Sequence, residues 1–354
     1  MKKVVHIIDN LKRGGAETLL HHVVTNLKGY DNYIITLTDA NDFSSIEMQD
    51  IQVTSLKFNS ILSLPFVVLK LRKIIIQLNP DVVHAHLPLS SLVARLSTPS
   101  SIKLFISIHN KYSDSFKKVS PRLFFLEKKL HSKRDNLLFV SDSIRKDYDL
   151  IVGIKGTSQV LHNFIADKYF AKENQLEQNT SSREKLRLVS VGSLKKQKNF
   201  ETLIKAFSLL DASKFSLDIF GEGSERTHLE ILIKQLQLNN INLRGSVSNV
   251  ESHLKNYDAY ILASRYEGFG IAPLEAAALG LPLLLSEIDV FKEVTKGYAI
   301  YFSPNDINGI AVTIRHFVDN IGQANERAVA FKPVIEKEYS KAEYIQKLIK
   351  IYNS

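Results

Sequence analysis

Two glutamates separated by seven residues, Glu267 and Glu275, flank a glycine loop in the stretch S-R-Y-E-G-F-G-I-A-P-L-E-A-A-A-L-G-L-P. The loop leads into a segment with helix punctuation, a proline in its first turn and Gly-Leu-Pro at its end. Backbone N–H groups are unpaired at a helix N-terminus and the helix dipole favours anions, so a diphosphate suits this place. Carboxylates accept hydrogen bonds from hydroxyl groups. The stretch therefore predicts a site for a diphosphate with a hydroxyl-rich group at each end.

The same stretch resembles the signature of the retaining glycosyltransferases of family 4, including their E-X7-E pair. The resemblance implies the GT-B fold, an α/β architecture of two doubly wound Rossmann-like domains facing across a cleft. It also implies a nucleotide-sugar donor whose ribose is held by Glu275 and whose sugar is held by Glu267. Main-chain amides of the intervening loop would donate hydrogen bonds to the phosphate or the sugar. The residues of this loop are Gly268, Phe269, Gly270 and Ile271.

A second strand end, in V-S-V-G-S-L-K-K-Q-K-N, supplies a cation for the same ligand. Lys198 is placed to neutralise the diphosphate as a compact point charge. Family members often carry an arginine after the glycine, where this chain has Ser193. Either Lys195, Lys196 or Arg265 compensates for that missing charge, or the site relies on Lys198 and the helix dipole.

Two residues of the first half complete the predicted site. Gly15, in N-L-K-R-G-G-A-E-T, permits close approach of the backbone to a ligand. By the resemblance, its amide lies near the donor diphosphate and the acceptor, and a plain strand-to-helix turn is the alternative. His109 matches a histidine that faces the donor sugar from the N-terminal domain, although a structural histidine at a strand end is the other interpretation. The predicted catalytic residues are thus Glu267, His109 and Lys198.

Two other patterns have metal-ligand spacing. His84 and His86 share one face of a predicted strand, but no third ligand is evident in the sequence, so we interpret them as structural. The acidic pair Asp147 and Asp149 has D-x-D spacing, but its context is helical and does not follow a buried strand. We expect no metal and no cofactor, with a UDP- or GDP-linked sugar as the donor substrate.

Apolar runs alternate with helical patterns along the chain, which indicates βαβ units and parallel sheets. The predicted strands lie near residues 5, 35, 84, 106 and 138 in the first half, and near 190, 218, 243, 261, 284 and 300 in the second.

The sequence predicts an N-terminal domain, a linker, a C-terminal nucleotide-sugar-binding domain and a last segment. The resemblance implies that this last segment packs back on the N-terminal domain. Their predicted ranges are 1–168, 171–185, 184–336 and 337–354. The last segment contains an amphipathic helix with Tyr344, Leu348 and Ile351 on one stripe.

Composition restricts the location and the partners. The 354 residues include no cysteine, and no apolar stretch approaches the roughly 20 residues of a spanning helix. We expect a cytoplasmic protein, at most peripheral at the inner face of the cell membrane. Residues 1–170 hold 23 Lys and Arg against 15 Asp and Glu, which favours contact with an anionic membrane. No nucleic-acid-binding motif accompanies this charge, so we expect no nucleic acid partner.

Two segments have the composition of a membrane-contacting helix. Residues 120–134 mix aromatic and basic side chains as an interfacial helix would, while core packing with a solvated face is the default interpretation. Residues 64–78 are interpreted as a helix that covers the sheet.

The predicted activity is transfer of a sugar, with retention of configuration, to an acceptor hydroxyl on a glycan or lipid-linked molecule. Surface polysaccharide or glycolipid assembly is the expected setting. A sugar-nucleotide epimerase of the same fold and a non-catalytic partner subunit are the alternatives.

Overall fold

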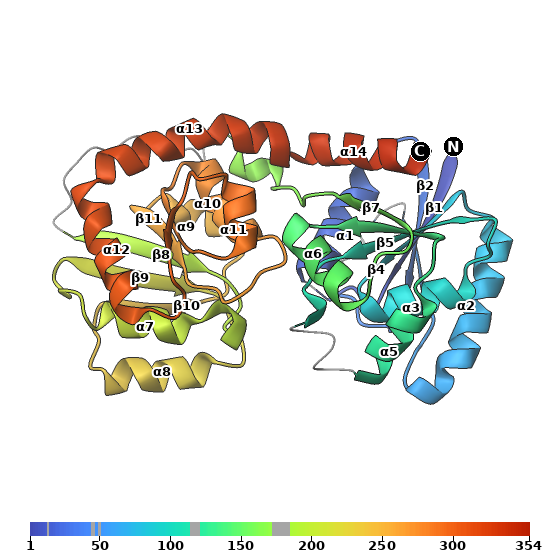
Figure 1. The fold of residues 1–354 in the computed structure, drawn as a ribbon, viewed down its shortest axis with the longest axis horizontal. Helices are drawn as coiled ribbons and strands as arrows, with labels where there is room; N and C mark the ends of the chain where they lie inside the picture. Colours follow the sequence, from blue (N-terminus) through green and yellow to red (C-terminus); the bar gives the residue numbers. More distant parts are fainter. Residues whose placement is uncertain (13, 44–46, 49–50, 114–120, 172–184) are drawn as a thin grey trace. The chain divides into compact units, whose positions relative to one another are not determined.

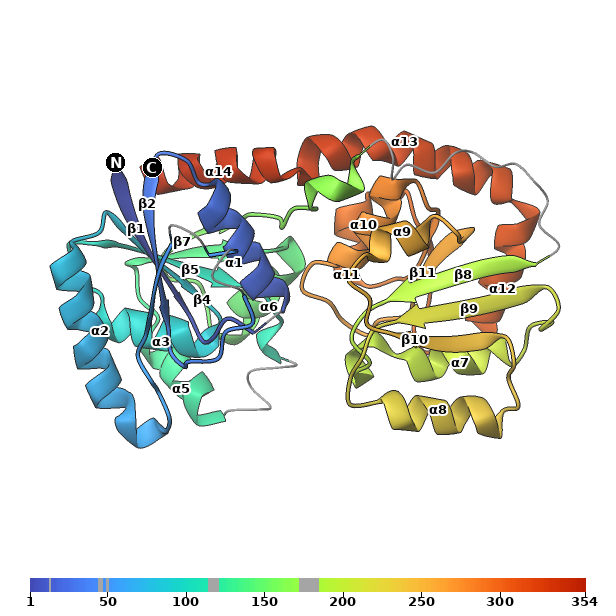
Figure 2. The same ribbon diagram turned by 180° about the vertical axis from the view of Figure 1, so that it is seen from behind.

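The computed structural model describes the chain apart from residues 13, 44–46, 49–50, 114–120 and 172–184. Two compact units make up the protein, residues 1–163 with 344–354, and residues 164–343. Figures 1 and 2 show an α/β architecture in each unit. Most of the predicted linker, 171–185, lies outside the described residues.

The N-terminal unit is built on a seven-stranded parallel sheet with the strand order β3-β2-β1-β4-β5-β6-β7. The middle strands consist of buried apolar residues because helices cover both faces of a doubly wound sheet. The strands are β1 (Lys2–Ile8), β2 (Tyr30–Thr36), β3 (Gln52–Ser55), β4 (Val82–His86), β5 (Lys103–Ile108), β6 (Asp135–Phe139) and β7 (Thr157–Val160).

Helices connect these strands in βαβ order. They are α1 (Gly15–Asn26), α2 (Leu64–Leu78), α3 (Pro88–Ser97), α5 (Pro121–Leu130) and α6 (Asp142–Ile151). The last helix, α14 (Lys341–Asn353), buries the predicted stripe of Tyr344, Leu348 and Ile351. Its Tyr352 hydroxyl lies 2.6 Å from His84 Nδ1, so this helix packs on the N-terminal sheet.

The C-terminal unit has a six-stranded parallel sheet with the order β10-β9-β8-β11-β12-β13. Its strands are β8 (Leu186–Val191), β9 (Phe215–Phe220), β10 (Ile241–Gly245), β11 (Ala259–Leu262), β12 (Leu283–Ser286) and β13 (Ile300–Phe302). The direction of strand addition reverses between β8 and β11. Ligands bind at the carboxyl ends of the strands at such a reversal, and here those ends lead into the two loops that carry Lys198 and Glu267.

The helices of this unit are α7 (Phe200–Phe207), α8 (Arg226–Gln235), α9 (Val250–Leu254), α10 (Ile271–Leu279), α11 (Asp289–Thr295), α12 (Ile307–Asp319) and α13 (Ile321–Tyr339). Short 3₁₀ turns are present at Ile61–Ser63, Asp167–Tyr169 and Lys196–Lys198. Among the helices, α10 is buried along most of its length, which its Ala- and Leu-rich sequence permits.

The two predicted doubly wound domains are confirmed, as is every strand predicted from an apolar run. Two strands were not predicted, β3 and β7. Both lie at the edges of the N-terminal sheet and are partly exposed, so their sequences, Q-V-T-S and T-S-Q-V, lack an apolar run. No helix in the described part of the chain is long and apolar enough to cross a membrane.

Candidate functional site

The predicted strand, glycine loop and helix of the C-terminal unit are β11, the loop 263–270 and α10. Gly270 caps α10 in the left-handed region, with φ of 89°, and a Cβ there would lie 2.7 Å from the ring of Phe291. Glycine is therefore required at this position on both counts. The Phe269 side chain is buried, with its ring 5.7 Å from that of Tyr339. Glu267 and Phe269 of the loop are thus buried while Arg265 is exposed, and the N-terminus of α10 has no side-chain cap.

Glu267 and Lys198 form an ion pair, with Nζ 2.6 Å from Oε1. The Ser264 hydroxyl donates to the same carboxylate oxygen at 2.6 Å. Only 7% of Glu267 is exposed, so the ammonium group compensates a nearly buried charge. The carbon chain of Lys198 lies against Gly192, where an added Cβ would come within 3.2 Å of it.

Three hydrogen bonds hold the Lys198 loop against the Glu267 loop. Asn199, in the left-handed region with φ of 57°, donates its side-chain amide to Ala263 O at 3.1 Å. The backbone N–H of Arg265 donates to Gln197 O at 2.9 Å. The Gln197 amide donates to Tyr266 O, also at 2.9 Å. The lysine is therefore fixed by its loop as well as by its charge.

Glu275 lies in the first half of α10, partly buried. Burial raises the pKa of its carboxyl to about 7, while a hydrogen bond from Tyr169 and the charge of Lys168 act in the opposite direction. Lys168 itself pairs with Glu251 at 2.7 Å. A carboxyl poised near neutral pH accepts a hydroxyl hydrogen bond more strongly once it has lost its proton.

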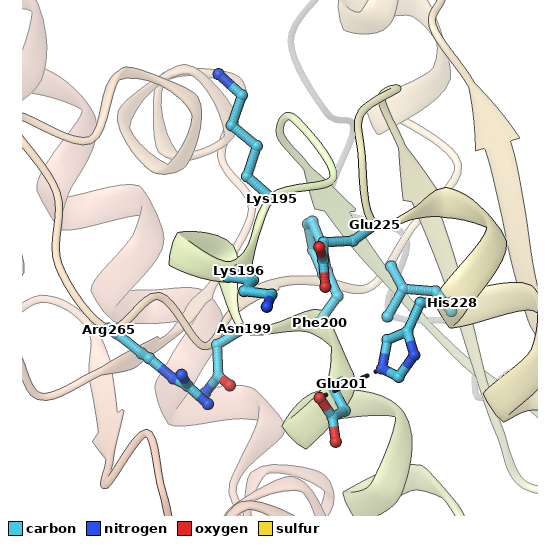
Figure 3. A pocket seen from close by; sticks show the side chains of 9 residues that line it. Lys195, Lys196, Asn199, Phe200, Glu201, Glu225, His228 and Arg265 are labelled. Atoms are coloured by element: carbon cyan, nitrogen blue, oxygen red, sulfur yellow. Dashed lines mark hydrogen bonds and ion pairs between the residues drawn. The ribbon is translucent and has the colours of Figure 1, made fainter. Parts of the chain in front are cut away.

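The three cations considered as substitutes for an arginine at Ser193, which are Lys195, Lys196 and Arg265, line part of a separate pocket of about 500 Å³. Figure 3 shows Lys195, Lys196 and Arg265 on one side of it. Glu225 and the Glu201–His228 pair lie opposite. Among the described residues, its lining includes none of Ser193, Lys198, Glu267 or Glu275.

In the N-terminal unit, Gly15 is the first residue of α1 and Gly14 is its N-cap. A Cβ on Gly15 would meet no atom within 4 Å, so internal packing does not require glycine there. Burial raises the pKa of two nearby carboxyls, Asp9 and Glu17. Asp9 accepts hydrogen bonds from the backbone and the hydroxyl of Ser90 at the start of α3. Sequence reasoning did not select Asp9, although its place directly after β1 was a usable signal.

His109 follows β5, and burial lowers the pKa of its ring to about 4. Its Nε2 is buried without a hydrogen-bond partner in the described part of the chain. The ring lies 6.1 Å, between centroids, from that of His86. A neutral ring with one unsatisfied nitrogen remains available to a ligand.

A third histidine that was not evident in the sequence pattern joins His84 and His86. His6 pairs in register with His84 across β1 and β4, and one ligand atom from each of the three rings lies within 4.8 Å of the others. The sequence could not show this, because the third histidine lies on a different strand.

Most ring nitrogens of this His6–His84–His86 cluster have a hydrogen-bond partner. His84 bonds to the hydroxyls of Tyr352 and Ser107, at 2.6 and 2.8 Å. His6 Nδ1 lies 3.3 Å from His86 Nε2. A metal ion would compete with these bonds, so the cluster is organised as a hydrogen-bonded core that could hold a metal only by rearranging.

Asp147 and Asp149 lie in α6 and bind backbone groups. Asp147 accepts from the N–H groups of Tyr112 and Ser113, at 2.7 and 3.2 Å, and Asp149 accepts from Ile154 N–H at 2.9 Å. Both carboxylates therefore have structural contacts.

Two family models match the chain in succession. The model described as Glycosyltransferase Family 4 matches residues 13–168, and the one described as Glycosyl transferases group 1 matches residues 171–331. The solved structure of HepE from Anabaena, in complex with UDP and glucose, has the same fold, with a TM-score of 0.85, 14% identity and full coverage of both chains.

The chain is a glycosyltransferase of the GT-B type.

Two curated relatives of this glycosyltransferase differ in how much they share with it. An uncharacterized 41.2 kDa protein in the cps region of Klebsiella pneumoniae is 20% identical over 99% of both chains. The poly(glycerol-phosphate) alpha-glucosyltransferase of Bacillus subtilis is 28% identical over 51% of this chain and 27% of its own length. This glycosyltransferase therefore spans about a quarter of the Bacillus enzyme.

The glycosyltransferase brings some of its predicted site residues together. Within the C-terminal unit, Lys198 and Glu267 are in contact, and Gly270 links Glu267 to the helix that carries Glu275. Ser193 precedes the buried Leu194 in the same loop as Lys198. Gly15 and His109 belong to the N-terminal unit and follow β1 and β5.

Proposed function

We propose that this glycosyltransferase transfers a sugar from a nucleoside diphosphate sugar to an acceptor hydroxyl with retention of configuration. The observation that carries the proposal is the Lys198–Glu267 ion pair at the uncapped N-terminus of α10. A cation beside a helix N-terminus suits a diphosphate, and the carboxylates on either side of the loop suit hydroxyl groups.

Each residue has a role set by its charge. Lys198 and the amides from Gly268 to Ile271 would stabilise the departing diphosphate, where negative charge develops. Glu275 would accept from the ribose, and Glu267 would accept from the donor sugar once Lys198 turns toward phosphate. His109 would contact the donor sugar, the role that the family resemblance implies for it.

The comparisons support a sugar linked to UDP, since HepE was solved with UDP and glucose. The Bacillus relative is named for glucosyl transfer to poly(glycerol-phosphate), which supports a polymeric acceptor in surface polysaccharide or glycolipid assembly.

A panel of nucleotide sugars tests the donor. A ligand present at 100 times its dissociation constant stabilises the folded protein by about 2.7 kcal/mol, which thermal unfolding resolves. The donor found in this way is then incubated with oligosaccharide and lipid-linked acceptors, and NMR determines the anomeric configuration of the product. Transfer with inversion would contradict the proposed mechanism.

The same experiment separates the alternatives. An epimerase would convert the nucleotide sugar in the absence of an acceptor. A non-catalytic partner subunit would bind it and form no product with any acceptor.

A further inference from the structure

Helix α2 exposes large apolar side chains on its outer side. Phe66 is 75% exposed, Leu69 is 65% exposed and Ile76 is 57% exposed. The 3₁₀ turn immediately before the helix adds Ile61 and Leu62, of which Leu62 is 85% exposed. We call these five residues the α2 apolar stripe. Exposed apolar groups that gather on one element mark an interaction surface.

The stripe lies opposite the side of α2 that packs on the protein. Val67, Leu71 and Ile75 are the buried residues of the helix. At about 100° per residue, the centre of Phe66, Leu69 and Ile76 is roughly 180° from the centre of that buried set. Core packing thus accounts for one face of α2 and leaves the other without a partner in the described part of the chain.

Basic side chains lie on both flanks of the stripe and also within it. Residues 51–80 include Lys57, Lys70, Arg72 and Lys73 and no Asp or Glu. Lys70 and Arg72 fall on the two flanks of the stripe by the same helical geometry, and Lys73 falls within it. All three are exposed, and none has an ion-pair partner among the described residues.

This combination selects one kind of partner. A helix with apolar residues in the middle and Lys or Arg at the sides lies in the interface of an anionic bilayer, where the cations reach the headgroups. With 15 residues, α2 is about 22 Å long, too short to span the hydrocarbon core. A second copy of the chain would place like charges opposite each other, which opposes self-association through this face.

The segment 120–134, whose composition is more typical of an interfacial helix, exposes fewer apolar side chains among the described residues. Within α5, Phe125 is the one large apolar residue that is strongly exposed among those described. Glu127 of the same helix is fully buried and pairs with Arg95. We propose that the α2 apolar stripe and its flanking cations dock the N-terminal unit on an anionic lipid surface. The proposal rests on the proposed function only in that docking would bring the enzyme to a lipid-linked acceptor.

The chain contains no tryptophan, so a single introduced indole reports on one position. The test compares Phe66→Trp with the matched control Phe125→Trp, which replaces an equally large exposed ring on α5. With vesicles containing 40% phosphatidylglycerol, the emission of Phe66→Trp is expected to shift to the blue and to be quenched by brominated lipid. The emission of Phe125→Trp is expected to stay unchanged. Responses confined to Phe125→Trp, or absent from both variants, would overturn the proposal.

Sedimentation with vesicles tests the residues themselves. The triple variant Lys70→Gln, Arg72→Gln, Lys73→Gln is expected to partition roughly 100-fold more weakly at low salt, since each cation near such a surface contributes about a factor of five. Leu62→Ser with Phe66→Ser is expected to reduce binding at both low and high salt. Lys128→Gln with Lys129→Gln is the control on α5 and should bind like the wild type.

Two further measurements distinguish lipid docking from a folding defect and from self-association. Thermal unfolding and UDP binding should be unchanged in every α2 variant, so loss of vesicle binding with intact UDP binding supports docking even if the donor assignment fails. Sedimentation velocity detects self-association, and a dimer that is lost in Leu62→Ser with Phe66→Ser, without vesicle binding by the wild type, would assign the stripe to a second copy instead.

Discussion

Lys198 Nζ lies 2.6 Å from Glu267 Oε1, so two residues that the sequence assigned to different parts of the donor are in direct contact. The pair is largely removed from solvent, and Ser264 shares the carboxylate. A diphosphate would attract the ammonium away from Glu267 and free the carboxylate for a sugar hydroxyl. The ion pair therefore links phosphate binding to sugar binding within one loop pair.

Lys198→Ala is expected to weaken UDP binding and also to lower the melting temperature, because Glu267 keeps its charge but loses its cation. Loss of a hydrogen bond to a charged group costs about 1.5 to 3 kcal/mol. Calorimetry with UDP and thermal unfolding measure the two effects. In the double variant Lys198→Ala, Glu267→Gln, stability should recover while UDP affinity stays low. If Lys198→Ala and the double variant are equally stable, the charge of Glu267 does not depend on Lys198 for its stabilisation.

UDP affinity is expected to rise by up to about tenfold between pH 6 and 8, because Glu275 changes from mostly protonated to mostly ionised around its pKa of about 7. Only the ionised carboxylate acts purely as an acceptor for ribose hydroxyls. UDP itself titrates near pH 6, so the informative comparison is with Glu275→Gln. That variant should retain only the ligand's own pH dependence, and an identical profile in both proteins would remove Glu275 from the ribose site.

The strands and the E-X7-E loop were predictable from sequence because their signals are local. Apolar runs identify buried parallel strands, and Gly270 with Gly280 limits α10 at both ends. The edge strands β3 and β7 were not predictable, because an exposed edge needs no apolar run.

Contacts between distant residues were the part of the site that the sequence could not supply. His6 and His84 are 78 positions apart and become neighbours only through strand register. The sequence also could not show which side of α2 is exposed. Leu69 and Leu71 are the same residue type, and only the structure shows that the first is exposed and the second is buried. Periodicity identified the helix but not which of its two apolar sides faces the sheet.

Turnover is expected to persist in excess chelator, because Lys198 and the N-terminus of α10 would neutralise the charge of the diphosphate without a metal ion. The assay is donor turnover with and without EDTA, followed by metal analysis of the purified protein. Zinc bound in proportion to protein and lost in His86→Ala would assign an ion to the histidine cluster. Activity lost in EDTA and restored by magnesium or manganese would instead contradict metal-independent transfer.

Acid is expected to destabilise the N-terminal unit through its buried histidines. Burial lowers the pKa of His6 to about 4 and that of His84 and His86 well below the usual value. An unfolded histidine titrates near pH 6.5, so between about pH 4 and 6.5 the unfolded state binds more protons than the folded state. Stability therefore falls as the pH drops through this window, by on the order of 2 kcal/mol for His6 alone at pH 5.

Thermal unfolding at pH 7 and pH 5 measures this effect, and the melting temperature should fall at the lower pH. His84→Asn should reduce the difference between the two pH values, because it removes one of the groups that must be kept neutral. His228→Asn is the matched control, since His228 lies on the surface of the C-terminal unit and should leave the difference unchanged. The burial of Glu275 acts in the opposite direction, because a raised carboxyl pKa makes the folded state bind the extra proton. A pH difference that is equally large in the wild type and in His84→Asn would mean that the histidine cluster accepts protons in the folded state.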